Sequence, residues 1–436
     1  MSARANGRSV VVRRGALCVL AGWTSLLAGC AIYHSKPLPV RPDLARAVPA
    51  SLDPSRGLTE INVITLAVAG NPRLEAERLR AGVARAQLLE AGLLPDPRIS
   101  GGLTKSSLHT GYDAAVGEDI QALITRGASK DAAAAHLRQV NLEILWQEWQ
   151  VAERARELYI DAEAVGRLRR VLDRRRRLLG RLYRRDEKSL ERRYLTVSAV
   201  SADFAAWNTA ESDWRALELR ENRTRHALDE LLGLDPTVRL RLRGAPASAP
   251  ITAGRFRAAV AALPRRRADL LALRAGYRSE QQRLREAILA QFPLLDAGVQ
   301  KARSAEEGIQ TIGFNVTLTL PLFNRNRGPI AIARATRTYM YRAYQERLDR
   351  AVNQADRVFR ATQIMQRQLE TLDARLPALE RAATAAHESL RRGSLSLSDY
   401  ARVDANALAM QAEAIQLRAS LAQARSVLAT LLALPF

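Results

Sequence analysis

Residues 310–330 carry the most regular pattern in the chain. From Gln310 to Leu320, apolar residues alternate with polar or small ones without interruption. The apolar positions are Ile312, Phe314, Val316, Leu318 and Leu320. A period of two predicts a β-strand with one apolar and one polar face. These eleven residues match the roughly 9–11 that a tilted strand needs to cross a bilayer. Pro321 ends the strand, and a helical pattern begins near Pro329.

A single strand cannot lie in lipid, because its backbone groups need hydrogen-bonding partners. Three further strands are predicted, near residues 99–103, 111–122 and 295–299. In the second of these, Glu118 interrupts the apolar positions, which are Tyr112, Ala114, Val116, Ile120 and Ala122. Four strands cannot close a barrel, since the smallest outer-membrane barrels have about 8. Several chains must therefore combine: two would give eight strands and three would give twelve, and strand physics alone does not choose.

Helical periodicity fills most of the remaining chain, interrupted by polar turns at residues 186–189 and 392–394. The predicted helices cover residues 58–94 (with a break at Asn71-Pro72), 128–185, 194–234, 255–291, 329–391 and 396–434. The order helix, hairpin, long helix, turn, helix occurs twice. Leu74 precedes Pro97 by 23 residues, and Leu270 precedes Pro293 by the same number. An internal duplication is therefore predicted, with a first structural repeat at 58–234, a linker at 235–254 and a second repeat at 255–436.

The long helix of the second repeat has a heptad seam. Its positions are Tyr344, Leu348, Ala351, Ala355, Val358, Thr362, Met365, Leu369, Leu372, Leu376, Leu379, Ala383, Ala386 and Leu390. Steps that alternate between four and three residues favour a coiled coil. Pro377 lies inside the run and predicts a local kink. The predicted fold is mainly α with a small β part: a long α-helical coiled-coil barrel bearing β-hairpins for an oligomeric transmembrane barrel.

The N-terminus has the pattern of an export signal. Four arginines precede an apolar segment, Ala16–Leu27, that is too short to span a bilayer as a helix. The segment ends in Leu27-Ala28-Gly29-Cys30, which resembles the bacterial lipoprotein signal. Residues 1–29 are thus a predicted signal peptide, Cys30 a predicted lipidation site and residues 30–57 an acylated tether. The alternative is an ordinary secretory cleavage site near a chance cysteine. Ala31 instead of aspartate implies sorting to the outer membrane.

The composition argues against several classes of function. The chain has a net charge of +22, but its 45 acidic residues are interspersed with the basic ones, so solvated helix faces are expected and nucleic acid is not. None of the five histidines lies in an HExxH pair, and no P-loop, nucleophile elbow or dinucleotide turn occurs. No enzyme activity, metal site or cofactor is expected. A periplasmic structural coiled-coil lipoprotein remains an alternative, which the paired amphipathic strands disfavour.

Several segments together resemble the TolC-type outer-membrane efflux family. They are Asn71-Pro72-x-Leu74, residues 93–97 (LLPDP), residues 321–328 (PLFNRNRG) and Leu376-Pro377 ahead of Gly393. The resemblance covers roughly residues 58–434. It implies a homotrimer whose twelve strands form a barrel in the outer membrane of a Gram-negative bacterium and whose helices form a periplasmic tunnel. It also implies two partners: a periplasmic adaptor protein and an inner-membrane pump of the RND type.

The resemblance also assigns site residues. The two helical turns correspond to the periplasmic tips, where the adaptor docks and the tunnel narrows; the tip residues are Glu187, Lys188, Ser189, Leu190, Gly393, Ser394, Leu395 and Ser396. Asp399 resembles a gate aspartate of the pore, while Arg402 stands at the position of the second one. In the first tip Arg193 stands where an acid is expected. The alternative role for Asp399 is that of an acid favoured by the helix dipole.

The run Asn324–Gly328 resembles the heavy-metal, CzcC-like branch of the family, which makes heavy-metal cations the expected cargo. The alternative for this run is a polar strand-to-helix turn. The alternatives for the cargo are drugs or other organic compounds, or secreted polypeptides in a type I system.

Overall fold

The computed structural model describes residues 33–49, 57–107, 110–246, 249–292 and 294–434. The predicted signal peptide and Cys30 lie outside these ranges. Contacts divide the chain into a unit ending at Leu44 and a unit beginning at Ala45. In the first unit, residues 33–44 are exposed and form no helix or strand. All helices and sheet strands described below belong to the second unit.

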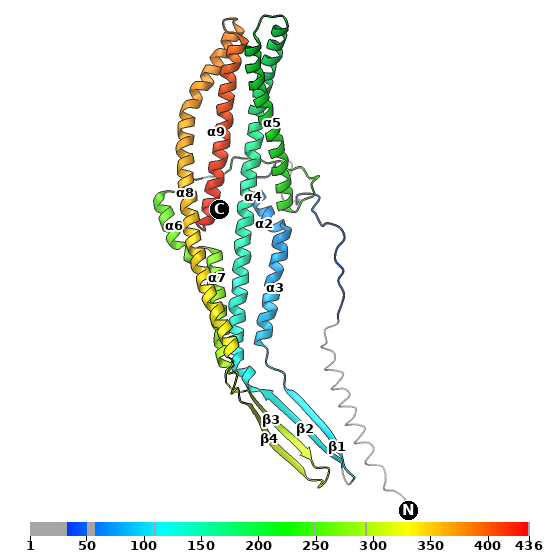
Figure 1. Cartoon of the computed structure of the whole chain (residues 1–436). Coiled ribbons are helices and arrows are strands. Elements are labelled where there is room, and N and C mark those ends of the chain that lie inside the picture. The colour runs from blue at the N-terminus through cyan, green and yellow to red at the C-terminus, as the bar shows by residue number, and fades with distance from the viewer. Residues whose placement is uncertain (1–32, 50–56, 108–109, 247–248, 293, 435–436) are drawn as a thin grey trace, which may run out of the picture. The chain divides into compact units, whose positions relative to one another are not determined.

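The second unit contains two copies of one series of elements (Figure 1). The first copy consists of α2 (Glu60–Gly70), α3 (Pro72–Gly92), β1 (Arg98–Lys105), β2 (Thr110–Asp119), α4 (Ile120–Glu191) and α5 (Val197–Leu232). The second consists of α6 (Ala253–Arg266), α7 (Ala268–Leu289), β3 (Leu294–Arg303), β4 (Gln310–Thr319), α8 (Arg327–Arg391) and α9 (Leu397–Leu431). The predicted mainly α fold with an internal duplication is confirmed.

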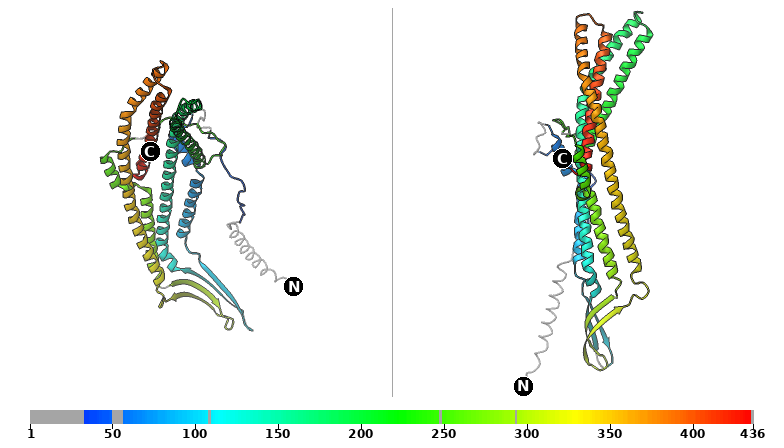
Figure 2. Two further views of the ribbon diagram at one scale, coloured as in Figure 1. Left: turned by 45° about the horizontal axis from the view of Figure 1, so that its top comes forward. Right: turned by 90° about the vertical axis from the view of Figure 1, so that its left-hand side faces the viewer.

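Each copy is built on its long helix. The shorter helices α2, α3 and α5 pack along α4, while α6, α7 and α9 pack along α8. The two copies meet where α4 contacts both α7 and α9. Toward the turns that connect α4 to α5 and α8 to α9, four helices form a layer in the order α5, α4, α9, α8. The helix pairs α4–α5 and α8–α9 separate from each other as they approach these turns (Figure 2). No described helix is long and apolar enough to cross a membrane.

The break between the first two helices of each copy is fixed by a buried side chain. Asn71 caps α3 by accepting a hydrogen bond from the Leu74 amide, and its own amide group donates to the Leu231 carbonyl at 2.8 Å. Arg267, which is fully buried, occupies the same place in the second copy and donates to the Leu431 carbonyl at 3.3 Å. The sequence predicted the first break but one continuous helix over 255–291, because Pro264 lies inside α6 and no proline follows Arg267 as Pro72 follows Asn71.

The four strands form one antiparallel sheet in the order β1-β2-β3-β4. Directly opposed residues share a face. Ile99 faces Val116, Val116 faces Val299, and Val299 faces Phe314. The predicted apolar parity therefore continues across all four strands, interrupted by Glu118 opposite Ala297 and by Lys301 opposite Ile312.

The second strand is shorter than predicted. It ends at Asp119, whose carboxylate accepts a hydrogen bond from the Ala122 amide and begins α4. Ile120 and Ala122 are consequently helical and not part of the outward face of the strand. A short polar side chain at this position satisfies a free amide of the first helical turn, which is why the helix starts there.

The heptad seam of α8 is buried at several of its small positions, including Ala351, Ala355, Thr362, Ala383 and Ala386. Small side chains let α9 and α7 approach α8 closely. The helix is continuous from Arg327 to Arg391 and passes through Pro377.

Candidate functional site

The first turn between long helices is not at residues 186–189, as the sequence suggested. Helix α4 continues to Glu191, and the turn is formed by Arg192, Arg193 and Tyr194. Glu187, Lys188, Ser189 and Leu190 therefore lie in the last turns of α4. Their polar character does not stop the helix, because Tyr183 donates a hydrogen bond to Glu187 one turn later, and Ser189 donates to the Arg185 carbonyl.

The second turn lies where it was predicted, after Arg391. Gly393, Ser394 and Ser396 are exposed and Leu395 is half-buried. Ser396 caps α9 by accepting a hydrogen bond from the Asp399 amide at 3.1 Å.

The two turns correspond residue by residue, with numbers that differ by 200. The amide of Arg193 donates to the Leu190 carbonyl, as that of Gly393 does to Leu390. The amide of Tyr194 donates to Ser189, as that of Ser394 does to Ser389. Arg193 and Gly393 both have left-handed backbones, with φ of 59° and 74°. Arg193 therefore occupies the position of the turn glycine, and the expectation that it replaces an acid was wrong; the counterpart of Asp399 is Ala199.

Asp399 is engaged locally at the start of α9. Its carboxylate accepts a hydrogen bond from the Ser396 hydroxyl at 2.7 Å and lies 3.7 Å from the Arg402 guanidinium. Both side chains are exposed, at 52% and 71%. The two residues assigned to the gate are thus brought together as an ion pair, in which the charge of the acid is balanced by the base.

Asp404 has a different role. It is buried, and both of its oxygens lie 3.1 Å from the Arg174 guanidinium. The Tyr400 hydroxyl donates to the same carboxylate at 3.1 Å. This contact joins α4 to α9 below the tips, so Asp404 is a structural residue of the helix layer.

A pair of acids near the tips was not singled out from the sequence. Asp186 of α4 is buried and accepts a hydrogen bond from the Arg185 guanidinium at 2.9 Å. Burial raises the pKa of Asp203 on α5, and a hydrogen bond to Asp186 together with its like charge raises it further. Arg402 and Arg185 act in the opposite direction. The signal that could have revealed this pair is Asp186 itself, an acid at a seam position of α4 between Leu182 and Leu190.

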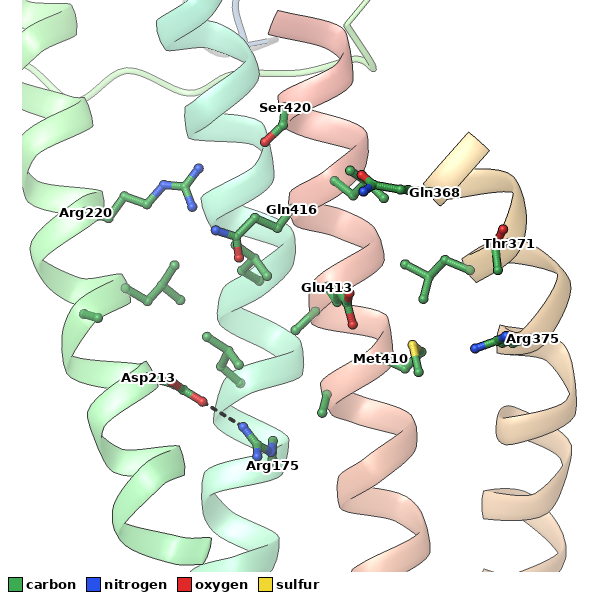
Figure 3. A pocket seen from close by; sticks show the side chains of 18 of the residues that line it. Arg175, Asp213, Arg220, Gln368, Thr371, Arg375, Met410, Glu413, Gln416 and Ser420 are labelled. Atoms are coloured by element: carbon green, nitrogen blue, oxygen red, sulfur yellow. Dashed lines mark hydrogen bonds and ion pairs between the residues drawn. The ribbon is translucent and has the colours of Figure 1, made fainter. Parts of the chain in front are cut away.

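A hollow of about 960 Å³ opens across α5, α4, α9 and α8 (Figure 3). Its lining includes Arg175, Arg220, Arg223 and Arg375 with two acids, Asp213 and Glu413. Arg175 pairs with Asp213 at 2.7 Å. Apolar side chains from Leu168, Leu172, Leu372, Met410 and Leu417 complete it.

The hollow lies on the face of α4 that is turned away from the linker. Leu168, Leu172 and Arg175 line it, whereas Gly166 and Arg170 line a second hollow beside linker residues 244–245. Positions two residues apart on a helix are separated by about 200°. The two hollows therefore open on opposite faces of the helix layer.

The apolar face of the sheet is exposed in the single chain. Ile99 and Leu103 on β1 are 81% and 84% exposed, and Ile312 and Phe314 on β4 are 73% and 87% exposed. The opposite face carries small and polar residues such as Ser100, Gly298, Asn315 and Thr317. A sheet with these two faces separates an apolar medium from an aqueous one.

Comparison with known proteins agrees with this architecture. Residues 260–434 match the family model described as "Outer membrane efflux protein". No curated protein sequence matches the chain significantly.

Solved structures share the fold, among them the following three. The outer-membrane channel OprN is 15% identical, with a TM-score of 0.70, covering 93% of this chain and 99% of OprN. CusC, described for its transmembrane channel formation, is 16% identical with a TM-score of 0.68, covering 92% of this chain and 99% of CusC. The outer membrane protein VceC from Vibrio cholerae is 16% identical with a TM-score of 0.69, covering 86% of this chain and 96% of VceC.

These structures show that both repeats, and not only the residues matched by the family model, share one known fold. Residues 260–434 thus match the outer membrane efflux protein family, and the chain as a whole shares the fold of these solved structures.

Proposed function

We propose that this protein is the outer-membrane exit channel of a tripartite efflux system. The observation that carries the proposal is the four-stranded sheet, which exposes a largely apolar face, interrupted by Glu118 and Lys301, and has unpaired outer edges on β1 and β4. Unpaired backbone groups are too costly to leave in lipid, so both edges need strands from other copies. Three copies supply twelve strands, a number that can close a barrel.

The helix layer supports the same assembly. Its outer members are α5 and α8, so a ring of copies would bring α5 of one copy beside α8 of the next. In such a homotrimer the face of the layer that is turned away from the linker lines the tunnel. The hollow with Arg220 and Arg375 then opens into the tunnel, while the linker lies outside.

We assign the turns at residues 192–194 and 392–394 to the periplasmic tips. A periplasmic adaptor protein docks there, on residues that include Glu187, Lys188, Gly393 and Ser394, and an inner-membrane pump of the RND type loads the tunnel. The tips lie at the end of the helices opposite the sheet (Figure 1), which suits a bridge between two membranes. Acylation of Cys30 would add a lipid anchor in the outer membrane. Radiolabelled palmitate should enter the wild-type protein but not C30S.

The first cargo class we propose is heavy-metal cations, on the resemblance of residues 324–328 to the heavy-metal branch. In the structure this run closes the turn between β4 and α8. Asn326 has a left-handed backbone with φ of 52°, and its side-chain amide donates to the Ala287 carbonyl at 2.7 Å. The run therefore has a structural role as well.

The second cargo class is anionic or amphiphilic organic compounds, which the hollow in the helix layer favours. Two of its four arginines are ion-paired, Arg175 with Asp213 and Arg220 with Asp161, which leaves Arg223 and Arg375 beside Glu413, and leucines lie between them. A surface of this composition attracts organic anions and repels metal cations.

Two measurements test these proposals. Purified protein in a planar bilayer should conduct in steps of uniform size if it forms the channel; absence of conductance from verified trimers would refute the channel. A strain lacking the protein is then exposed to zinc, cobalt, nickel, cadmium, copper and silver beside dyes, detergents and antibiotics. Sensitivity confined to metals supports the first cargo class, and sensitivity confined to organic compounds supports the second.

A further inference from the structure

Charged side chains in the four strands are sorted by sign between the two faces of the sheet. The apolar face carries three basic residues and one acidic residue, which are Lys105, Lys301, Arg303 and Glu118. The polar face carries three acidic residues and one basic residue, which are Asp113, Asp119, Asp296 and Arg98. The high net charge of the chain does not explain this sorting, because it would place basic residues on both faces alike.

Two of the three basic residues lie on β3, where the apolar face ends toward the hairpin turns. Lys301 is opposite Ile312, the apolar residue of β4 nearest the turn. Arg303 is opposite Gln310, so it lies one row beyond the last apolar residue of that strand. These turns form the end of the sheet that points away from the helices (Figure 1). The positive charges therefore begin where the apolar surface stops.

Lys105 on β1 completes this charged edge. It is opposite Thr110, one row beyond Tyr112, and Tyr112 is itself opposite Arg303. Two strand spacings and one row separate Lys105 from Arg303, which amounts to about 12 Å between their backbones. Lysine and arginine side chains are long enough to approach one headgroup from such positions. Glu118 lies at the other end of the apolar face, next to the start of α4.

The three basic side chains are not paired with acids in the part of the chain that the structure describes. Lys105 and Lys301 are exposed, and neither forms an ion pair with a described residue. Arg303 is half-buried, and its Nε donates to the Gly308 carbonyl at 3.3 Å, which holds the guanidinium beside the turn without neutralising it. Two exposed glutamates, residues 306–307, follow in the turn beyond the strands, and they form no ion pair with these cations.

We propose that Lys105, Lys301 and Arg303 bind the phosphate groups of a phosphorylated lipid in the outer leaflet of the outer membrane. This inference rests on the proposed function, which makes the apolar face the lipid-facing surface and places the hairpin turns outside, and it adds the class of lipid. Basic side chains at the end of an apolar band keep their stems along the band and extend their charges to the depth of the headgroups.

The same surface explains why the lipid should be anionic and on the outer side. Phosphate oxygens accept strong hydrogen bonds from ammonium and guanidinium groups, and a neutral headgroup would leave three positive charges unbalanced. Tyr112, in the row of Arg303, has the place of an aromatic residue at a membrane interface. Glu118 at the helix end of this face repels an anionic headgroup, so the attraction is confined to the turn end.

The experiment uses the full-length protein, purified in detergent and examined by native mass spectrometry, which reports the oligomer and its retained lipids together. The probes are bis-phosphorylated lipid A, the same lipid after enzymatic removal of its phosphates, and phosphatidylethanolamine. Wild-type protein should bind the phosphorylated lipid at least tenfold more tightly than either other probe. The triple variant K105Q, K301Q and R303Q should lose this preference, whereas K301R with R303K, which keeps the charges, should retain it within threefold.

The matched control is the triple variant R357Q, R367Q and R381Q, which removes the same charge from exposed positions away from the sheet end of α8. Its affinity for the phosphorylated lipid should stay within twofold of the wild type. Equal affinity for the two forms of the lipid, no loss in the first triple variant, an equal loss in the control, or displacement of the lipid by an equimolar amount of inorganic phosphate would overturn the inference.

Conductance of the same protein separates this inference from the proposed function. Trimers that conduct but do not prefer the phosphorylated lipid refute only the lipid site. Verified trimers that do not conduct refute the proposed function.

Discussion

Replacing the buried Arg267 by methionine should destabilise the junction of the two repeats more than any exposed arginine would. The guanidinium donates to Asp269 at 2.9 Å and to the Leu431 carbonyl at 3.3 Å. It also lies 4.7 Å from the centre of the Trp146 ring. One side chain thus connects the break between α6 and α7 with α4 and with the end of α9.

The magnitude follows from what each partner loses. Removing one member of a buried ion pair costs about 3–5 kcal/mol, and a cation–π contact adds about 0.5–2 kcal/mol. Two effects reduce the loss. Asp269 keeps its hydrogen bonds to Arg347 and to the Leu270 amide. Burial lowers the pKa of Arg267 because it disfavours the charged guanidinium, and methionine, which has no charge, avoids this desolvation cost. We expect R267M to lower the free energy of unfolding by about 2–4 kcal/mol.

The assay is urea-induced unfolding of the purified protein in detergent, followed by pulse proteolysis of the unfolded fraction. The control is R360M, because Arg360 is 74% exposed and, among the described residues, pairs only with Asp356 on its own helix. Such a pair contributes about 0.3–0.5 kcal/mol. If R267M shifted the urea midpoint no more than R360M does, the argument that Arg267 stabilises the junction would be refuted.

Three further predictions concern single residues. N71A should cost about 1–3 kcal/mol in the same urea assay, because it leaves the half-buried Leu231 carbonyl at the end of α5 without its donor; an unchanged midpoint would contradict this. G393A should speed amide exchange at the second tip about fivefold, because φ of 74° costs a non-glycine residue about 1 kcal/mol. R193G should slow amide exchange at the first tip for the same reason. Equal exchange rates in the wild type and both variants would count against backbone strain at these two positions. Burial, then the like charge of Glu157, raises the pKa of Glu153 to about 7 from 4.5. The folded state therefore binds the extra proton between these values, and stability falls as pH rises through them. E153Q should be more stable than the wild type by about 1–3 kcal/mol at pH 8 and no different at pH 4.5; a pH-independent difference would refute the assignment.

The sequence predicted those elements whose physical signal is local. The alternation around Phe314 defined a strand, Asn71-Pro72 marked a helix break, and Gly393 marked a turn. It failed where the signal was absent or misleading. The first turn has Arg193 in a left-handed backbone where a glycine is usual, and the polar residues before it were interpreted as the turn although they continue the helix.

Contacts between distant segments account for the remaining misses. Arg267 ends a helix because of groups on α4 and α9, which no local pattern reveals. The same is true of the acidic pair formed by Asp186 and Asp203, which lie on different helices 17 residues apart. Burial of a charged residue depends on its neighbours in space, so it becomes visible only once the helices are placed.

The two repeats have kept their backbone contacts and changed their side chains, which makes the tips unequal. Phe204 on α5 is half exposed and lies 5.4 Å from the Tyr183 ring, whereas its counterpart Asp404 is buried against Arg174. Arg193 and Gly393 differ in the same way. A homotrimer would therefore present six hairpins of two alternating kinds, with threefold and not sixfold symmetry. A partner that binds both kinds should bind the first more tightly, because only that tip adds an exposed tyrosine to its arginines, so R192E should weaken docking more than R392E does.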